Sequence, residues 1–219
     1  MRLRASLPVL LAVAIAASAA ACGGVRARPP PATPAAAPPL AEPPAGRVLA
    51  PAAARRAPRP ADPFRAALPG RRVLVLDPRA RVLRLRDTST GRTLATAPAG
   101  AGPTHVVARG GVAWVVDTRL EALLVYATAP RLEPTRRLYL PGSPYGIALD
   151  AARGRLWVAL SARNRLAELP AHGRPHVLRE LPTVRGPRGV VTTAGAAGPV
   201  FVRAGATVQA VDPDRVEDR

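Results

Sequence analysis

The chain has 219 residues and a formal net charge of +18, because 32 basic residues outnumber 14 acidic ones. Its single cysteine excludes an intrachain disulfide bond, so packing must supply the stability of any domain outside the cell. Aromatic residues make up 3% of the sequence, which argues against single-stranded nucleic acid as a partner because stacking platforms are few. Every lysine-or-arginine position is an arginine, a bias typical of a GC-rich genome. The alternative explanation of the high positive charge is attraction of the domain to anionic lipids or cell-wall polymers.

Residues 1–21 have the composition of a secretory signal peptide. Arginines near the start precede an apolar run that is too short to cross a bilayer, which takes about 20 residues. The run ends in small residues directly before Cys22 and so resembles a bacterial lipobox, although Ala19 stands where leucine is usual. We predict a lipid on Cys22 and a position on the extracytoplasmic face of the cell membrane. The alternatives are a secreted protein cut by ordinary signal peptidase, or an uncleaved anchor.

Residues 22–62 form a predicted tether that is rich in proline and alanine. A segment with so few large apolar side chains cannot bury enough surface to offset the entropy of ordering, so we expect it to be disordered and solvated. Its prolines favour an extended geometry of about 3.1 Å per residue, which predicts a semi-rigid spacer with a reach on the order of 100 Å. Residues 48–50 are a short apolar stretch within it.

Residues 63–213 contain four repeats. Two markers share a period of 40 to 44 residues. The strand-centre marker is Leu74, Trp114, Trp157 and Phe201. The proline marker is Pro63, Pro103, Pro144 and Pro187. Units of this length, built of short strands and turns, are typical of propeller blades. We therefore predict an all-β fold, a small β-propeller of about four blades at 63–102, 103–143, 144–186 and 187–213, with a tail at 214–219.

The third unit shows the expected blade most clearly. Strands are predicted at 145–150, 155–160, 165–169 and 177–181. Apolar and polar residues alternate in the third of these segments, as they do in a half-buried strand.

The same unit resembles a known repeat. It reads GSPYGIALD at 142–150, GRLWVA at 154–159 and NRL at 164–166. These motifs are similar to the repeats of the YncE-like (YVTN) β-propeller family and, more weakly, to NHL repeats and virginiamycin B lyase. The resemblance covers about residues 63–212 and implies a propeller whose first strands line a central channel. The motif specifies a blade and not an activity.

The number of strands raises the question of closure, since relatives in that family usually have more than four blades. The last unit ends after three strands, and residues 48–50 are expected to supply its outer strand beside residues 207–211. The alternatives are an open arc, the pairing of two chains, or a truncated relative. An open arc would expose sheet edges and favour self-association.

Candidate ligand-binding residues follow the marker prolines, where the resemblance places one mouth of the channel. They are Phe64, Arg65, His105, Tyr145 and Arg188. Aromatic faces beside guanidinium groups suit a small planar or carboxylated ligand, which a guanidinium can bind through two parallel hydrogen bonds. The alternative is that these side chains simply fill the channel.

Two other pairs are interpreted as structural. Asp77 and Asp117 occupy equivalent places after the second strand of their units and are expected to cap turns. Trp114 and Trp157 are expected to be wedges between adjacent blades rather than ligand platforms.

The predicted function is a membrane-tethered binding or scaffold module with no catalytic residues, metal or cofactor. One alternative is a lyase that resembles virginiamycin B lyase, for which His105 is the histidine at a suitable position. Another is an interaction subunit that docks on an exported protein through its blade edges.

Overall fold

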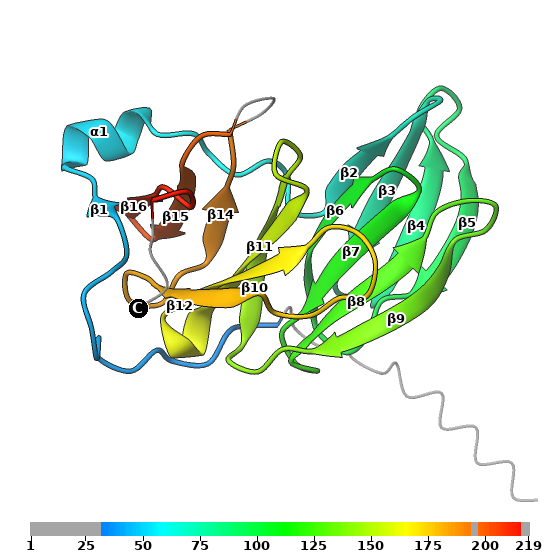
Figure 1. Cartoon of the computed structure of the whole chain (residues 1–219). Helices are drawn as coiled ribbons and strands as arrows, with labels where there is room; N and C mark the ends of the chain where they lie inside the picture. The colour runs from blue at the N-terminus through cyan, green and yellow to red at the C-terminus, as the bar shows by residue number, and fades with distance from the viewer. Residues whose placement is uncertain (1–31, 194–196, 216–219) are drawn as a thin grey trace, which may run out of the picture.

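In the computed structural model, which describes residues 32–193 and 197–215, sixteen strands form four antiparallel sheets of four strands each. Each sheet is one blade of a β-propeller module, and the blades follow one another in chain order (Figure 1). The predicted all-β propeller of four blades is therefore confirmed.

The blades have the following bounds. Blade 1 comprises β2 (Arg65–Leu68), β3 (Arg72–Asp77), β4 (Val82–Asp87) and β5 (Thr93–Pro98). Blade 2 comprises β6 (Pro103–Arg109), β7 (Val112–Asp117), β8 (Ala122–Ala127) and β9 (Glu133–Tyr139). Blade 3 comprises β10 (Pro144–Asp150), β11 (Arg155–Leu160), β12 (Arg165–Pro170) and β13 (Arg179–Pro182). Blade 4 comprises β14 (Gly189–Val191), β15 (Val200–Ala204), β16 (Thr207–Val211) and β1 (Arg47–Val48). A short helix α1 (Pro51–Arg56) follows β1, and a single 3₁₀ turn η1 (Ser161–Arg163) joins β11 to β12.

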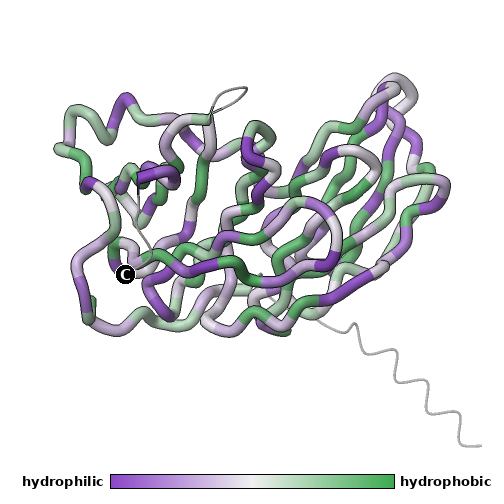
Figure 2. The backbone as a smooth tube through the Cα atoms, viewed as in Figure 1, coloured by the Kyte–Doolittle hydropathy of each residue, from purple (hydrophilic) through white to green (hydrophobic). Residues whose placement is uncertain are grey.

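Neighbouring blades share hydrophobic cores, and Figure 2 shows the apolar segments of the chain within the sheets. Leu74 of blade 1 packs in one cluster with Val115 and Tyr126 of blade 2. Trp114 of blade 2 belongs to a cluster with blade 3, and Trp157 of blade 3 to a cluster with blade 4. The prediction that both tryptophans are wedges between blades is confirmed.

The predicted turn caps are also present. The Asp77 Oδ1 atom accepts the backbone N–H of Ala80 at 2.8 Å, and Asp117 Oδ1 accepts that of Leu120 at 2.8 Å. Both carboxylates therefore close the turn between the second and third strands of their blades.

Hydroxyl groups join each of two blades to the next at the marker prolines. Thr118 Oγ1 donates to the carbonyl oxygen of Pro144 at 2.6 Å, and Ser161 Oγ donates to that of Pro187 at 2.5 Å. Because all four residues are buried or nearly so, these bonds satisfy polar groups where consecutive blades meet.

Blade 4 is completed by a strand from the other end of the described chain. β1 pairs with β16, with Arg47 opposite Ala210 and Val48 opposite Gln209. This is the outer strand that the strand count predicted, and it covers the edge that β16 would otherwise expose.

Helix α1 covers the outward face of blade 4 and was not expected from the sequence. Ala54 and Ala57 pack against Val208, with Phe201 at the margin of the same cluster. The Arg203 guanidinium donates to the carbonyl oxygen of Ala57 at 2.8 Å. The sequence signal was local: a proline in the first turn followed by three alanines favours a short helix.

The blades form an open arc rather than a closed ring. Hydrophobic clusters of the described residues join blade 1 to blade 2, blade 2 to blade 3, and blade 3 to blade 4, and none of these clusters joins blade 4 to blade 1. In Figure 1 the arc runs from blade 1 at the right to blade 4 and α1 at the left.

Blade 1 ends the arc with a charged face. On its outward side, Val73 and Val75 of β3 lie opposite Arg86 and Arg84 of β4. Arg84 forms an ion pair with Asp77 at 3.0 Å. The aliphatic stems of such arginines can cover the valines while their charged ends remain in water.

Residues 32–46, here called the strap, lie along the ends of blades 2 to 4 and are blue at the lower edge of Figure 1. Asn164 Nδ2 donates to the carbonyl oxygen of Pro38 at 3.0 Å, and Ala45 N donates to Pro182 at 2.8 Å. The expectation of a disordered tether is wrong for residues 32–62. Proline and alanine lose little side-chain entropy on ordering, and their carbonyl groups accept hydrogen bonds from the blades. Residues 1–31, Cys22 among them, lie outside the described residues.

Candidate functional site

Two of the five predicted ligand residues lie together. The rings of His105 and Tyr145 meet edge to face, with centroids 5.3 Å apart and planes at 67°. Thr104 Oγ1 donates to the Tyr145 carbonyl oxygen at 2.9 Å and fixes the approach of β6 to β10. The next residue, Gly146, must lack a side chain, because a Cβ atom there would lie 2.3 Å from the carbonyl oxygen of Arg188.

His105 is held in its neutral form. Burial lowers its pKa to about 4, against a smaller opposing effect of the Tyr145 backbone. Its Nδ1 atom is buried without a hydrogen-bond partner among the described residues. A neutral imidazole packed against a tyrosine ring fits the alternative that this side chain fills the channel.

The other three predicted residues are exposed. Phe64 and Arg65 precede and begin β2, and Arg65 lies opposite Val75 on the outward face of blade 1. The backbone N–H of Arg188 donates to Arg203 within blade 4 at 2.8 Å, and its carbonyl oxygen is the atom that lies close to Gly146 of blade 3. The ring contact within the predicted set is therefore that of His105 and Tyr145.

A cavity lies at the side of the molecule, between blade 3 and blade 4. It has a volume of about 1010 Å³ and is bounded by the strap, by β13 and by the end of β16. Its apolar wall includes Pro43, Pro44 and Leu181. Its charged lining consists of Arg47, Arg165, Arg179, Arg215, Glu42, Glu180 and Asp212. We call this cavity the lateral cleft.

The arginines of the lateral cleft differ in their contacts. Arg165 forms an ion pair with Glu42 of the strap. Arg215 lies 3.3 Å from Asp212, and both side chains are well exposed. Arg47 of β1 is exposed and has no acidic partner among the described residues. Its guanidinium is thus available to an incoming anion.

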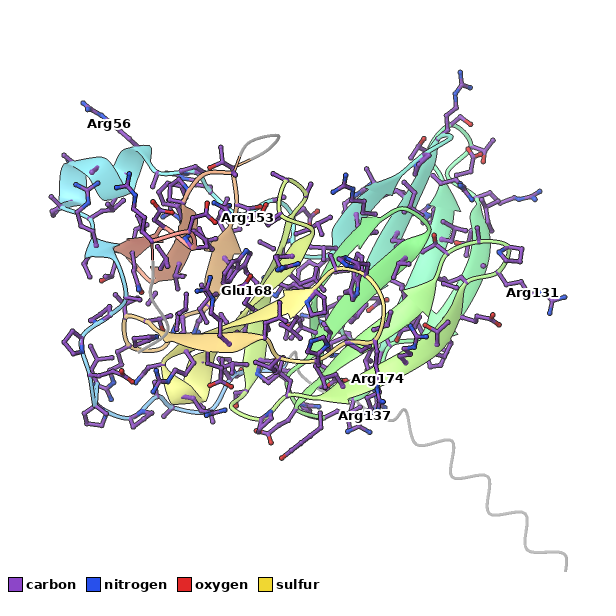
Figure 3. All side chains as sticks on the ribbon, in the orientation of Figure 1. Arg56, Arg131, Arg137, Arg153, Glu168 and Arg174 are labelled. Carbon is purple, nitrogen blue, oxygen red and sulfur yellow. The ribbon has the colours of Figure 1, made fainter. Side chains whose placement is uncertain are left out.

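Arg179 is held rigidly at this site. Its Nε atom lies 2.6 Å from Glu168 Oε2, and its Nη2 atom donates to the Pro213 carbonyl oxygen at 2.8 Å. Glu168, labelled in Figure 3, is buried and also binds Arg155 at 3.1 Å. Two guanidinium groups therefore share one carboxylate. Glu168 of β12 lies opposite Arg179 of β13 and so reaches the cleft. The alternation of apolar and polar residues in β12 does not distinguish Glu168 from an ordinary polar residue of a strand.

A second clamp ties the end of the described chain to blade 3. Arg153 binds Asp150 at 2.9 Å and Asp214 at 2.6 Å. The hydrogen bond to Asp214 raises the pKa of Arg153, and the same bond lowers the pKa of Asp214. Residues 212–215 are therefore fixed beside the lateral cleft.

No group of three or more His, Cys, Asp and Glu side chains in the described residues is placed to hold a metal ion. No helix among them is long and apolar enough to cross a membrane.

No protein-family model and no curated protein matches the sequence. Solved structures do match. A protein of unknown function from Desulfotomaculum acetoxidans is 14% identical, with a TM-score of 0.57 over 64% of this chain and 47% of that one. The β-propeller domain of Cps50 (Swd1) from Myceliophteria thermophila is 12% identical, with a TM-score of 0.54 over 66% of this chain and 52% of that one. A streptogramin B lyase is 15% identical, with a TM-score of 0.50 over 66% and 50%.

Likeness at this level of identity shows the fold alone. The chain spans about half the length of the solved structures it matches, in keeping with four blades in an open arc. The resemblance to YncE-like repeats in particular stays a prediction. This chain is a β-propeller module.

Proposed function

We propose that the chain is an exported, lipid-anchored propeller module that binds an anionic partner without catalysing a reaction. The observation that carries the proposal is the lateral cleft, where four arginines surround a cavity of about 1010 Å³. A guanidinium group binds carboxylates and phosphates through paired hydrogen bonds, so this lining suits a ligand with acidic groups.

The fixed parts of the cleft favour binding over mere solvation of charge. Arg179 cannot swing away, because Glu168 and the Pro213 carbonyl hold it. Arg165 lines the cleft from blade 3, as Arg179 does, and Arg47 lines it from β1 of blade 4. A group that is held in place before binding loses less entropy when a ligand arrives. A small polyanion or an acidic segment of another exported protein would meet guanidinium groups from both blades.

Binding can be tested with two probes, citrate and a short glutamate peptide, by isothermal titration calorimetry at low salt. Loss of Arg47 in R47A should weaken binding by about tenfold, because one charge-assisted contact is removed. The matched control is R131A, which removes an equally exposed arginine remote from the cleft. Equal weakening in both variants would show non-specific attraction to a basic surface. No binding of either probe would contradict the anionic-ligand proposal.

The channel mouth remains the alternative location for the ligand. A thermal-shift screen of anionic metabolites with R188A as the test variant separates the two sites. A shift lost in R188A and kept in R47A would place the ligand at the mouth, near Tyr145. The lyase alternative would need His105 to reach a substrate, whereas its side chain is buried and packed against the Tyr145 ring.

The anchor is tested by the replacement of Cys22 with alanine. The variant should be released to the medium or remain unprocessed, because the acceptor of the lipid is gone. A variant that stays membrane-bound at the mature mass would contradict the lipid anchor.

A further inference from the structure

The strap begins at a defined point on one end of the blades. Ala32 is 6% exposed and lies against Gly102, where an added Cβ atom would be 2.9 Å from the Ala32 Cβ. The same added atom would be 2.6 Å from the Cγ atom of Arg119. Ala32, the first described residue, therefore occupies a site that only a glycine at position 102 leaves open.

From Ala32 the strap crosses the loops that precede the inner strands of blades 3 and 4. Ala35 N donates to Ser143 Oγ at 3.2 Å, and Arg185 donates to the Ala37 carbonyl oxygen at 3.0 and 3.1 Å. These loops lie at the same end of the blades as the turns at 78–81, 118–121 and 161–164, since successive strands are antiparallel. We call this end of the molecule the strap face.

The length of chain before Ala32 limits how far the strap face can be from a lipid on Cys22. Nine residues, 23–31, separate the two positions. Even a fully extended chain spans at most about 3.6 Å per residue, so the whole link reaches no more than about 36 Å. The expected spacer of some 100 Å therefore shrinks to about a third, because residues 32–46 are bound to the blades.

We propose that the strap face lies against the membrane and contacts anionic phospholipid headgroups. This inference rests on the lipid anchor of the proposed function. The strap face presents exposed arginines from four different segments, namely Arg79, Arg81, Arg119, Arg137 and Arg185. Acidic groups on this face are engaged with the protein: Glu121 accepts the N–H of Gly142, which lowers its pKa, and Glu180 binds Arg163 at 3.0 Å. Clustered arginines next to an anionic leaflet are attracted to it.

Charge alone does not choose between the two ends of the blades. The opposite end also carries exposed arginines, among them Arg92 and Arg131, and Figure 3 shows Arg131 projecting from the far side of blade 2. The starting point of the strap favours the strap face, because the link of at most about 36 Å to Cys22 leaves the blades from that end. Consequently the opposite end of the channel faces away from the bilayer, and the lateral cleft opens to the side.

The test compares two positions in blade 1. Arg79 lies in the turn at the strap face, and Arg92 lies in the turn at the opposite end; neither side chain makes a hydrogen bond or ion pair within the described residues. The full chain is produced in a bacterial host that processes lipoproteins, as R79C and as R92C, and each new thiol receives a fluorescent donor. Because the lipid blocks the sulfur of Cys22, each variant has one free thiol. Each protein is reconstituted in vesicles of phosphatidylcholine and phosphatidylglycerol that contain an acceptor-labelled lipid.

Energy transfer to the lipid should be about twofold higher from R79C than from R92C, because a blade of six-residue strands separates the two sites by roughly 20 Å. In vesicles of phosphatidylcholine alone the difference should shrink. Equal or reversed transfer in a protein whose mass shows the lipid would overturn the inference and leave the anchor intact. An unchanged difference without anionic lipid would contradict headgroup contact. A mass without lipid, together with failure to bind vesicles, would refute the anchor and this inference at once.

Discussion

The two ends of the arc are finished in different ways. At blade 4 the outward face is apolar, with Phe201 and Val208, and a separate segment of chain covers it through α1. At blade 1 the outward face carries Arg84 and Arg86 where β8 of blade 2 has Leu124 and Tyr126. Repeat arrays need such terminal faces, because an inner repeat buries both sides and an end repeat buries one. Blade 4 is therefore covered by an additional segment of chain, whereas blade 1 carries arginines where an inner blade has apolar residues.

The capped end should be the more sensitive to mutation. Deletion of residues 47–56 removes β1 and α1, so the β16 edge and the Phe201 face become exposed. We expect the free energy of unfolding to fall by about 3–5 kcal/mol, as for the loss of a buried apolar cluster. Urea denaturation measures the effect.

A matched pair of point variants keeps this test informative if the deletion does not fold. F201A should cost about 2 kcal/mol because the ring packs against the cap, whereas L94A, on the exposed outer strand of blade 1, should cost less than about 0.5 kcal/mol. Equal costs would mean that the two ends do not differ in this way.

The pH dependence of the free energy of unfolding tests the interior of the arc, where His105 of blade 2 packs against Tyr145 of blade 3. His105 has a folded-state pKa of about 4, below its ordinary value of 6.5, so the unfolded chain binds the proton more readily. The stability that the neutral ring provides is complete above about pH 6.5 and is lost as the pH falls toward 4, by about 3 kcal/mol in total. Urea midpoints across this range should decline less in H105L than in the wild type. The surface variant H172N should retain the full decline; a decline of the wild-type size in H105L would contradict the assignment.

The charged outward face of blade 1 can be tested by replacing its arginines with apolar residues. The double variant R84L/R86L should change the free energy of unfolding by no more than about 1 kcal/mol, because these side chains are partly solvated. Its visible effect should be concentration-dependent dimerisation in sedimentation velocity, since the exposed face would match the inner surface of a blade. R92L is the control for loss of charge alone. A double variant that stays monomeric would show that arginines are not what protects this end.

Much of the fold was predictable because it repeats. The period of Trp114 and Trp157 predicted the blades, and the same period placed Asp117 at a turn. Because the last repeat had only three strands, it also predicted an outer strand near Val48. α1 was missed because six residues are too few to show a helical periodicity against an alanine-rich background.

The candidate site was less accessible to sequence reasoning. The strap binds through carbonyl groups of Pro38 and Ala37, whose partners lie 126 and 148 residues away, and any residue has a carbonyl group. The lateral cleft draws Arg47, Arg165 and Arg215 from three distant segments that no motif connects. By contrast, the contact between His105 and Tyr145 could be anticipated because both follow a marker proline, and a ligand-binding role for the pair stays a prediction.

The pairing of β1 with β16 also has a consequence for the order of folding. Gln209 Nε2 donates to the carbonyl oxygen of Ala45 at 2.5 Å across 164 residues of chain. A polypeptide is made from its N-terminus, so β1 has no strand partner until the last blade has followed. Contacts of such long sequence separation form late and slow the folding of a domain. During that interval blades 1 to 3 can assemble on their own, while the edge of β16 and the apolar face of blade 4 depend on a segment that was synthesised long before them.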